Sequence, residues 1–241
     1  MRLDTLLVKK GLVKSRNVAE SLIKNSKVSV NGKIITKPAK DLVDSTELKI
    51  EILEQPKYVG RGGLKLEKAL LEFKINPEDL VVLDVGSSTG GFTDCLLQQG
   101  AKKIYAIDVG TGQFDSKLKT DARVILMEKT DIRDVKNLPE KAELAVVDVS
   151  FISLELILPA VKKLLKEGGK IIALVKPQFE TPKIAKNKNG VVKSDDLRNT
   201  ALDKVKDFAL KFGLKTLDFI DSPISGGSGN KEYLLLLQNI V

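Results

Sequence analysis

A single stretch decides the fold of most of this chain: Val81-Val82-Leu83-Asp84-Val85-Gly86-Ser87-Ser88-Thr89-Gly90-Gly91-Phe92. Its first five residues form a mostly apolar run of the kind found in buried parallel strands. The loop that follows is rich in glycine and small polar residues, and a helical pattern begins near Phe92. A buried strand, a glycine loop and a helix in this order are typical of an α/β sheet.

Short apolar runs and helical stretches alternate beyond this point. With 241 residues and 42% hydrophobic content, the chain can bury one large core and a small one. We expect an α/β fold with a Rossmann-like, doubly wound sheet, preceded by a small α+β domain. The last two strands are joined by a connection too short for a helix, which predicts an antiparallel pair at the end of the sheet. The expected strands are residues 81–85, 104–108, 124–126, 144–148, 171–176, 216–220 and 233–238.

Polar residues occur at the end of each of the first five expected strands. In doubly wound sheets the ligand crevice lies outside the carboxyl ends of the strands, so these residues are candidates for a binding site. One such residue alone is more often a helix cap or turn former, but five in register favour a site. In strand order they are Asp84 with Gly86, then Asp108, Asp131, Asp148 and Lys176.

The glycine loop admits three chemical interpretations. As Gly86-Ser87-Ser88-Thr89-Gly90 it matches the nucleophile elbow of serine hydrolases, but the chain contains no histidine for a triad. As a dinucleotide loop it lacks the second glycine, because Ser88 stands where the backbone must approach a pyrophosphate. As the first loop of an S-adenosylmethionine domain it fits, since Gly86 and Gly90 let the backbone approach a ligand without phosphates.

An acidic pocket also suits a cationic cofactor better than a phosphate. We expect Asp84 to pair with the amino group of S-adenosylmethionine, directly or through water. Asp108 is expected to accept from the ribose hydroxyls and Asp131 from the adenine amine. The predicted cofactor-binding residues are Asp84, Gly86, Ser87, Ser88, Gly90, Gly91, Phe92, Asp108 and Asp131.

Four charged residues form the candidate catalytic set: Lys65, Asp148, Lys176 and Glu232. A hydroxyl is a poor nucleophile, so methyl transfer to it needs a base and cationic stabilisation of the developing alkoxide. We predict that Lys176 is the base. Lys65 alone could equally be a solvated lysine beside the buried face of its helix, and Glu232 alone is no more informative. Their combination at the sheet ends favours catalysis.

Other methyltransferase classes fit the sequence less well. Cytosine-C5 enzymes need a thiol nucleophile, but the only cysteine, Cys95, falls in a predicted helix where a small core residue is expected. Amine-directed enzymes usually show an Asn/Asp-Pro-Pro-aromatic loop, and Asp148-Val149-Ser150-Phe151 stands in its place. Without histidine and with one cysteine, no metal site and no disulfide are expected.

The net charge of +8 is concentrated near the N-terminus. Residues 1–40 hold ten lysines and arginines against two acidic residues, whereas the rest of the chain is balanced. Such a segment is typical of a polyanion binder, although lysine-rich faces also serve solubility. Its pattern predicts two short helices, the second capped by Ser15, and then a hairpin at Asn31-Gly32 and a strand over residues 48–52.

The N-terminal residues resemble the αL RNA-binding domain of a small-subunit ribosomal protein, tyrosyl-tRNA synthetases and pseudouridine synthases. The resemblance rests on Arg2-Leu3-Asp4, Gly11-Leu12-Val13, Ser15-Arg16, Leu22-Ile23, Val28-Ser29-Val30-Asn31-Gly32 and Lys37-Pro38. It implies that this domain binds RNA. The contacts it implies are Arg2, Ser15, Arg16, Lys24 and Lys33. Pro56 and the glycines after it mark the expected boundary, which gives domains of residues 1–57 and 58–241.

The larger domain resembles the TlyA (hemolysin A) family, in which an αL domain precedes an FtsJ-like methyltransferase. The resemblance rests on residues 61–66, 84–94, 147–154, 175–180 and 229–233, and it extends over nearly the whole chain. It implies S-adenosylmethionine-dependent 2′-O-methylation of cytidine in 16S or 23S ribosomal RNA, or in both. It also implies that Lys65, Asp148, Lys176 and Glu232 are the catalytic residues. The expected partners are therefore ribosomal RNA or ribosomal subunits.

Two other functions remain as alternatives. One is a non-catalytic RNA-binding factor in ribosome assembly, and the other is a haemolysin, as the family label says. The apolar runs are too short to span a bilayer and no signal-peptide pattern is present, so we expect a cytoplasmic protein without a membrane partner. The basic segment 180–193 is either a solvated loop or a mobile lid over RNA phosphates. The sequence leaves the oligomeric state open.

Overall fold

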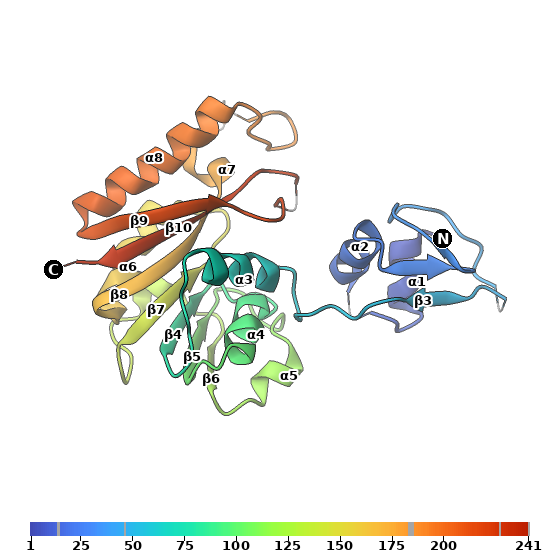
Figure 1. Cartoon of the computed structure of the whole chain (residues 1–241), viewed down its shortest axis with the longest axis horizontal. Coiled ribbons are helices and arrows are strands. Elements are labelled where there is room, and N and C mark those ends of the chain that lie inside the picture. The colour runs from blue at the N-terminus through green and yellow to red at the C-terminus, as the bar shows by residue number, and fades with distance from the viewer. Residues whose placement is uncertain (14, 46, 183–185, 227, 241) are drawn as a thin grey trace. The chain divides into compact units, whose positions relative to one another are not determined.

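The computed structural model describes residues 1–13, 15–45, 47–182, 186–226 and 228–240. The chain divides into two compact units, Met1–Arg61 and Gly62–Val241 (Figure 1). The division falls a few residues after the expected boundary at residue 57, inside the glycine-rich stretch that begins at Gly60.

The first unit packs two helices against a small sheet. Its elements are α1 (Leu3–Lys9), α2 (Arg16–Lys24), β1 (Val28–Val30), β2 (Lys33–Ile34) and β3 (Ile50–Ile52). The strands are antiparallel in the order β2-β1-β3. Asn31 and Gly32 have φ angles of 50° and 75°, which confirms the predicted tight hairpin. Leu12 follows the end of α1 and is 37% exposed.

The second unit is built on a seven-stranded sheet. Its strands are β4 (Val81–Val85), β5 (Lys103–Ile107), β6 (Val124–Met127), β7 (Ala142–Val147), β8 (Leu165–Val175), β9 (Leu214–Asp221) and β10 (Tyr233–Asn239). Their order is β6-β5-β4-β7-β8-β10-β9, and the first five strands of this order are parallel to one another. The prediction of a doubly wound sheet with an antiparallel end is confirmed.

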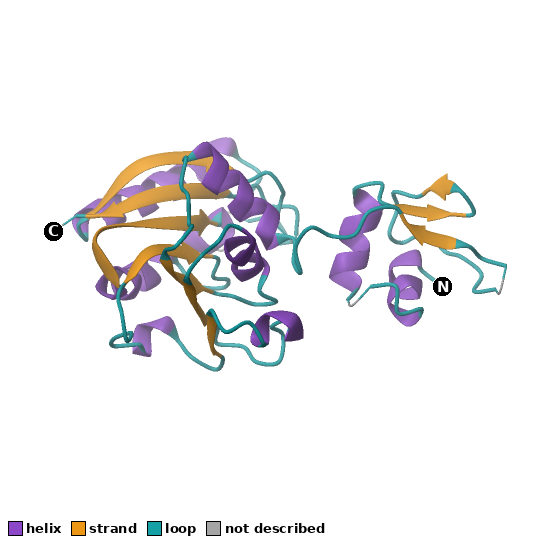
Figure 2. Ribbon diagram, turned by 60° about the horizontal axis from the view of Figure 1, so that its bottom comes forward, coloured by secondary structure: helices purple, strands orange, loops and turns teal. Residues whose placement is uncertain are grey.

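Helices cover both faces of this sheet (Figure 2). One core contains alternate residues of the strands together with apolar residues of α6 (Leu154–Leu164) and α8 (Asp195–Lys211). On the other side α3 (Gly62–Glu72) packs against α4 (Gly91–Gln98). The shorter helical turns are α5 (Ser116–Lys119), η1 (Ile132–Asp134) and α7 (Pro177–Glu180). The parallel strands β4, β5 and β7 and residues 171–175 of β8 are buried on both faces, as their apolar sequences require, whereas the edge strand β6 is partly exposed.

The strand β10 is inserted between β8 and β9 and is antiparallel to both. Its register pairs Tyr233 with Val175, so the residue before Tyr233 and the residue after Val175 lie at the same end of the sheet. These two residues are Glu232 and Lys176. The insertion therefore delivers a carboxylate to the end of the sheet where the parallel strands finish. Within the described ranges, no helix is long and apolar enough to cross a bilayer.

Candidate active site

The four candidate catalytic residues form two ion pairs at the carboxyl end of the sheet. Lys65 Nζ lies 2.6 Å from Glu232 Oε2, and both side chains are buried. Lys176 Nζ lies 2.6 Å from Asp148 Oδ1, in a more accessible position. A buried charge without a partner is strongly destabilising, and each carboxylate supplies the lysine beside it with an oppositely charged partner.

Two further observations bring the two pairs together. Glu232 Oε1 accepts a hydrogen bond of 3.5 Å from the side chain of Gln178, two residues after Lys176. A Cβ placed on Gly62 would lie 4.0 Å from Asp148 Oδ2, which shows that the start of α3 is close to Asp148. Lys65 is on the same helix, one turn further along. The residues predicted from four separate segments therefore surround one site.

Lys176 has two neighbours that the sequence did not single out. Its ammonium donates to Ser150 Oγ at 2.8 Å, and its Nζ lies 5.8 Å from the centre of the Phe179 ring. Phe179 in turn packs against Phe151, with 5.1 Å between ring centres. Phe151 is 90% exposed and has a φ of 65°, which is uncommon for an aromatic residue. An exposed aromatic ring thus stands beside the charged site.

Two glycines of the glycine loop are in close contact with other segments of the chain. Gly86 has a φ of 83°, and a Cβ there would lie 2.5 Å from the carbonyl oxygen of Asp148. Gly90 has a φ of 92°, and a Cβ there would collide with Leu118 and contact Phe114. We expected both glycines to make room for a ligand. The structure gives them a different reason, which is contact with neighbouring segments of the chain.

Asp84 is the fourth residue of β4, just before the glycine loop, and is completely buried. Its Oδ2 accepts 2.6 Å from Thr93 Oγ1, whereas Oδ1 has no hydrogen-bond partner among the described residues. Ser87 Oγ is likewise buried and has no hydrogen-bond partner among the described residues. Gly91 and Phe92, the first two residues of α4, are buried as well. Burial raises the pKa of Asp84 to about 7, and the nearby carboxylates of Asp148 and Asp108 add to the effect.

Asp108 follows β5 and is held by backbone donors. Its Oδ2 accepts 2.7 Å from the N–H of Ser88, and its Oδ1 accepts 2.7 Å from the N–H of Gly110. Each oxygen retains a second lone pair for another donor. Asp131 is placed differently, because its carboxylate is engaged by the guanidinium of Arg133, with Oδ2 2.6 Å from Nη2. An adenine amine would have to share Asp131 with that arginine.

The predicted RNA contacts lie in the first unit, and most of them have partners within it. Arg2 and Arg16 both bind Asp4. Ser15 Oγ accepts from the N–H of Val18 and caps α2, so this hydroxyl has a structural role. Lys24 is paired with Glu20 at 3.4 Å. Lys33 is exposed on β2.

The basic segment 180–193 is anchored where the structure describes it, while its residues 183–185 lie outside the described residues. Asn230 Oδ1 accepts from the N–H of Val192 at 3.0 Å. Arg198 donates to the carbonyl oxygens of Val192 and Lys193. Both anchoring side chains are buried. The end of this segment is therefore hydrogen-bonded to α8 and to the loop that precedes β10.

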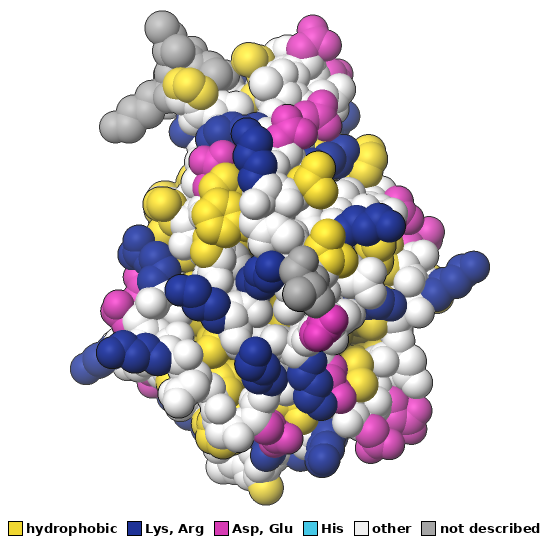
Figure 3. Space-filling view, turned by 90° about the vertical axis from the view of Figure 1, so that its left-hand side faces the viewer, with side chains coloured by type: hydrophobic (Ala, Val, Ile, Leu, Met, Phe, Trp, Pro, Cys, Tyr) yellow, Lys and Arg dark blue, Asp and Glu magenta, His cyan; other side chains and the backbone are white. Residues whose placement is uncertain are grey.

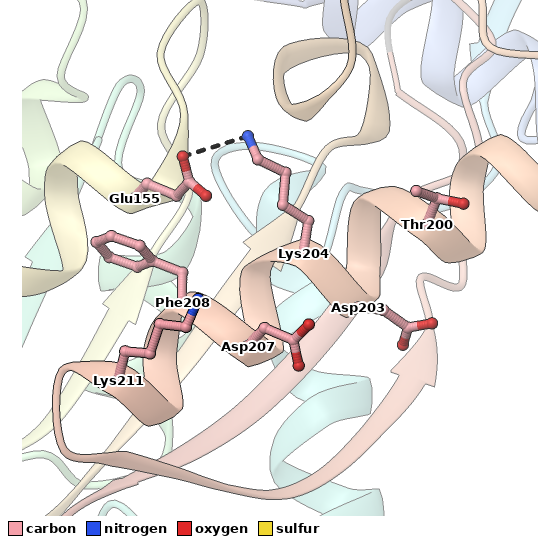
Figure 4. Close-up of a pocket in the computed structure, with 7 residues that line it drawn as sticks. All are labelled: Glu155, Thr200, Asp203, Lys204, Asp207, Phe208 and Lys211. Carbon is pink, nitrogen blue, oxygen red and sulfur yellow. Dashed lines mark ion pairs between the residues drawn. The ribbon is translucent and has the colours of Figure 1, made fainter.

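A separate open hollow lies on α8 and the first turn of α6 (Figure 4). Its lining includes an ion pair of 3.2 Å between Lys204 and Glu155, together with Phe208. None of the predicted catalytic or cofactor-binding residues lines it. Its mixed charges offer no set of convergent groups comparable to those at the end of the sheet.

Comparison with known proteins agrees with this arrangement. Residues 58–239 match the model of the FtsJ-like methyltransferases, and residues 1–47 match the S4 domain. The chain is 44% identical to a Bacillus subtilis protein provisionally named rRNA methyltransferase YqxC, with 98% of this chain and 85% of the relative covered. It is 39% identical to the 16S/23S rRNA (cytidine-2′-O)-methyltransferase TlyA of Mycobacterium tuberculosis, over 98% of this chain and 89% of the relative.

A solved structure from Streptococcus thermophilus that carries a provisional hemolysin name is also similar. It is 43% identical, with a TM-score of 0.80, and the match covers all of this chain and 88% of that one. The similarity extends over both units and includes the sheet that carries the two ion pairs. The chain therefore belongs to the TlyA (hemolysin A) family of FtsJ-like methyltransferases, with an S4 domain at its N-terminal end.

Proposed function

We propose that this protein transfers a methyl group from S-adenosylmethionine to the 2′-hydroxyl of cytidine in ribosomal RNA. The observation that carries the proposal is the pair of lysine–carboxylate contacts, Lys65–Glu232 and Lys176–Asp148, assembled beside an acidic glycine loop. The names of the matched relatives support ribosomal RNA as the substrate class. The S4 domain at the N-terminal end supports RNA binding.

The residues around the glycine loop fit S-adenosylmethionine. Two buried polar atoms, Asp84 Oδ1 and Ser87 Oγ, have no partner among the described residues, and buried polar atoms normally have one. The amino-acid end of the cofactor supplies N–H donors for such atoms. Asp108 would accept from the ribose hydroxyls with its remaining lone pairs. Because Asp84, Asp108 and Asp148 are close enough to influence each other, the site favours a cation.

When bound, S-adenosylmethionine supplies an activated methyl group on a sulfonium. The 2′-oxygen must lose its proton as its bond to the methyl carbon forms and the carbon–sulfur bond breaks. We assign the acceptance of that proton to Lys176 Nζ, which is held by Asp148 and Ser150 and must release one proton of its ammonium before it can act as a base. The ammonium of Lys65, paired with Glu232, would stabilise the developing oxyanion.

The surroundings of Lys176 also support a nucleotide substrate. Phe151 exposes its ring beside the Lys176–Phe179 contact, and exposed aromatic rings stack on unpaired bases. A base stacked there would place its ribose near the two ion pairs. The Asn230-anchored segment adds exposed lysines, Lys188 and Lys193, that can contact the RNA backbone.

The decisive experiment maps 2′-O-methyl groups in ribosomal RNA from cells with and without this gene. We expect one or more cytidines to lose methylation in the deletion strain, and purified protein to restore it in the presence of S-adenosylmethionine. If purified protein binds ribosomal RNA but no methyl group differs between the strains, the chain is a non-catalytic assembly factor. The identity of the cytidine shows whether the small subunit, the large subunit or both are substrates.

We expect Asp108→Ala to weaken S-adenosylmethionine binding. Loss of a charge-assisted hydrogen-bond acceptor typically costs about 1.5–3 kcal/mol, which corresponds to roughly 10- to 150-fold in affinity. Calorimetry on the purified protein measures the change. Asp121→Ala is the matched control, because it removes an equal charge from an ion pair with Arg123 in the turn before β6 and should leave the affinity unchanged. If the two substitutions have equal effects, Asp108 does not bind the ribose hydroxyls.

We also expect S-adenosylmethionine affinity to rise with pH between 5.5 and 7.5. Burial raises the pKa of Asp84 to about 7, so the carboxyl is protonated below that pH and ionised above it. A cationic ligand prefers the ionised form, and its affinity should fall up to about tenfold for each pH unit below 7. Asp84→Asn should remove this dependence, as measured by titration at several pH values. If the affinity of the variant still depends on pH in this range, the dependence comes from another titrating group.

A further inference from the structure

The first unit buries one carboxylate, Asp4, beneath two arginines. Asp4 is 0% exposed. Its oxygens accept from Arg2 Nε at 3.0 Å, Arg2 Nη2 at 2.7 Å and Arg16 Nε at 2.8 Å. The backbone N–H of Thr5 adds a fourth donor at 2.8 Å. These contacts, the bond from Arg2 first among them, hold the pKa of Asp4 well below its usual range.

The two guanidinium groups come from different helices. Arg2 is the residue that precedes α1, and Arg16 is the first residue of α2. Without a shared carboxylate these like charges would repel one another. Asp4 binds both while their side chains remain 43% and 52% exposed. Each guanidinium carries five N–H donors, which is more than Asp4 takes from either arginine.

We propose that Asp4 is a positioning residue that holds Arg2 and Arg16 together as one receptor for an RNA phosphodiester. The inference rests on the proposed RNA substrate. Two planar guanidinium groups fixed by a common acceptor match the oxygens of a phosphate, and the fixed geometry lowers the entropy lost on binding. A buried acid thus strengthens the binding of a polyanion, although its own charge has the wrong sign.

The sign of the charge effect provides the test. Asp4→Asn makes the unit more positive by one charge, so a purely electrostatic view predicts tighter binding of RNA. Loss of positioning predicts weaker binding. We expect the full-length variant to bind purified 16S and 23S ribosomal RNA about tenfold more weakly than wild type. The slope of log affinity against log salt should also become shallower, by about 0.7–0.9 for each phosphate that the variant no longer neutralises.

Asp44→Asn is the matched control in the same unit. Asp44 pairs with Lys9 at 2.8 Å and Lys10 at 3.2 Å, so its replacement changes the net charge equally without touching the two arginines. This variant should bind RNA as tightly as wild type or more tightly. If Asp4→Asn binds as tightly as Asp44→Asn, the positioning role is wrong.

A second variant covers the case in which Asp4→Asn fails to fold, as judged by circular dichroism and thermal melting. Arg2→Lys with Arg16→Lys keeps every charge and leaves Asp4 a cationic partner, but it removes both planar forks. We expect a similar loss of affinity, and wild-type affinity would overturn the proposal. A wild-type protein that binds neither RNA would instead overturn the proposed function.

Discussion

We expect Lys176→Ala to lose methyl transfer by at least 10²–10⁴-fold, the range over which a general base usually contributes. The reason is that Lys176 Nζ, at 2.6 Å from Asp148 and 2.8 Å from Ser150, is the group we assign to accept the 2′-hydroxyl proton. S-adenosylmethionine affinity should change little, because the base acts on RNA. Transfer of a radiolabelled methyl group to ribosomal RNA measures the first effect, and calorimetry measures the second.

Two further variants separate the possible roles of Lys176. Lys176→Arg retains a positive charge but cannot serve as a base, since a guanidinium stays protonated, and it should be as inactive as alanine. An active arginine variant would make the role electrostatic. Lys204→Ala removes a lysine from the ion pair with Glu155 in the separate hollow on α8 and should retain full activity. If Lys176→Ala turns over at the wild-type rate, Lys176 is not the base.

Deletion of residues 1–55 should abolish tight binding of ribosomal RNA. The excess positive charge of the chain lies within residues 1–40, and the remainder is balanced. On the face shown in Figure 3, basic side chains are scattered among acidic and apolar ones rather than gathered into one patch. The slope of log affinity against log salt should become shallower by about 0.7–0.9 for each phosphate that the deleted residues neutralise in the full-length protein. Filter binding over a range of salt concentrations measures both quantities.

The truncated protein should still fold and bind S-adenosylmethionine, because Gly62–Val241 is a compact unit with a complete sheet. Full-length protein with Arg2, Arg16, Lys24 and Lys33 replaced by glutamine is the matched control, since it loses the four predicted RNA contacts but keeps the domain. It should bind RNA as weakly as the truncation. If the truncation methylates ribosomal RNA at the full-length rate with an unchanged salt slope, the anchor lies in the lysine-containing segment after Glu180.

The positions of the strands and of the charged residues could be predicted from the sequence. Each parallel strand is a short apolar run that ends in a polar residue, so the site appears in the one-dimensional pattern. The pairing of Lys65 with Glu232 and of Lys176 with Asp148 could not be predicted, because it depends on where β10 enters the sheet. A sequence shows that β10 is antiparallel to its predecessor, but it does not show which other strand it joins.

The role of Asp4 was also invisible in the sequence. One of two acids among ten basic residues looks like ordinary surface charge, and only the structure shows that it is fully buried. Gly86 and Gly90 illustrate the opposite case. Their importance could be predicted, but the atoms that exclude a side chain belong to Asp148, Leu118 and Phe114, which are distant in sequence. Long-range contacts of this kind leave no local pattern.

During synthesis on the ribosome, β9 emerges before the strand that will hold it. In the finished sheet β9 pairs only with β10, and β10 occupies the place beside β8, so β9 cannot join the sheet early. Until Glu232 emerges, Lys65 also lacks the carboxylate that accompanies its burial. A nascent chain that stalls before this point presents an unpaired strand edge, which is prone to aggregation. Completion of the sheet and completion of the charged site are therefore a single event, so partly made chains remain inactive.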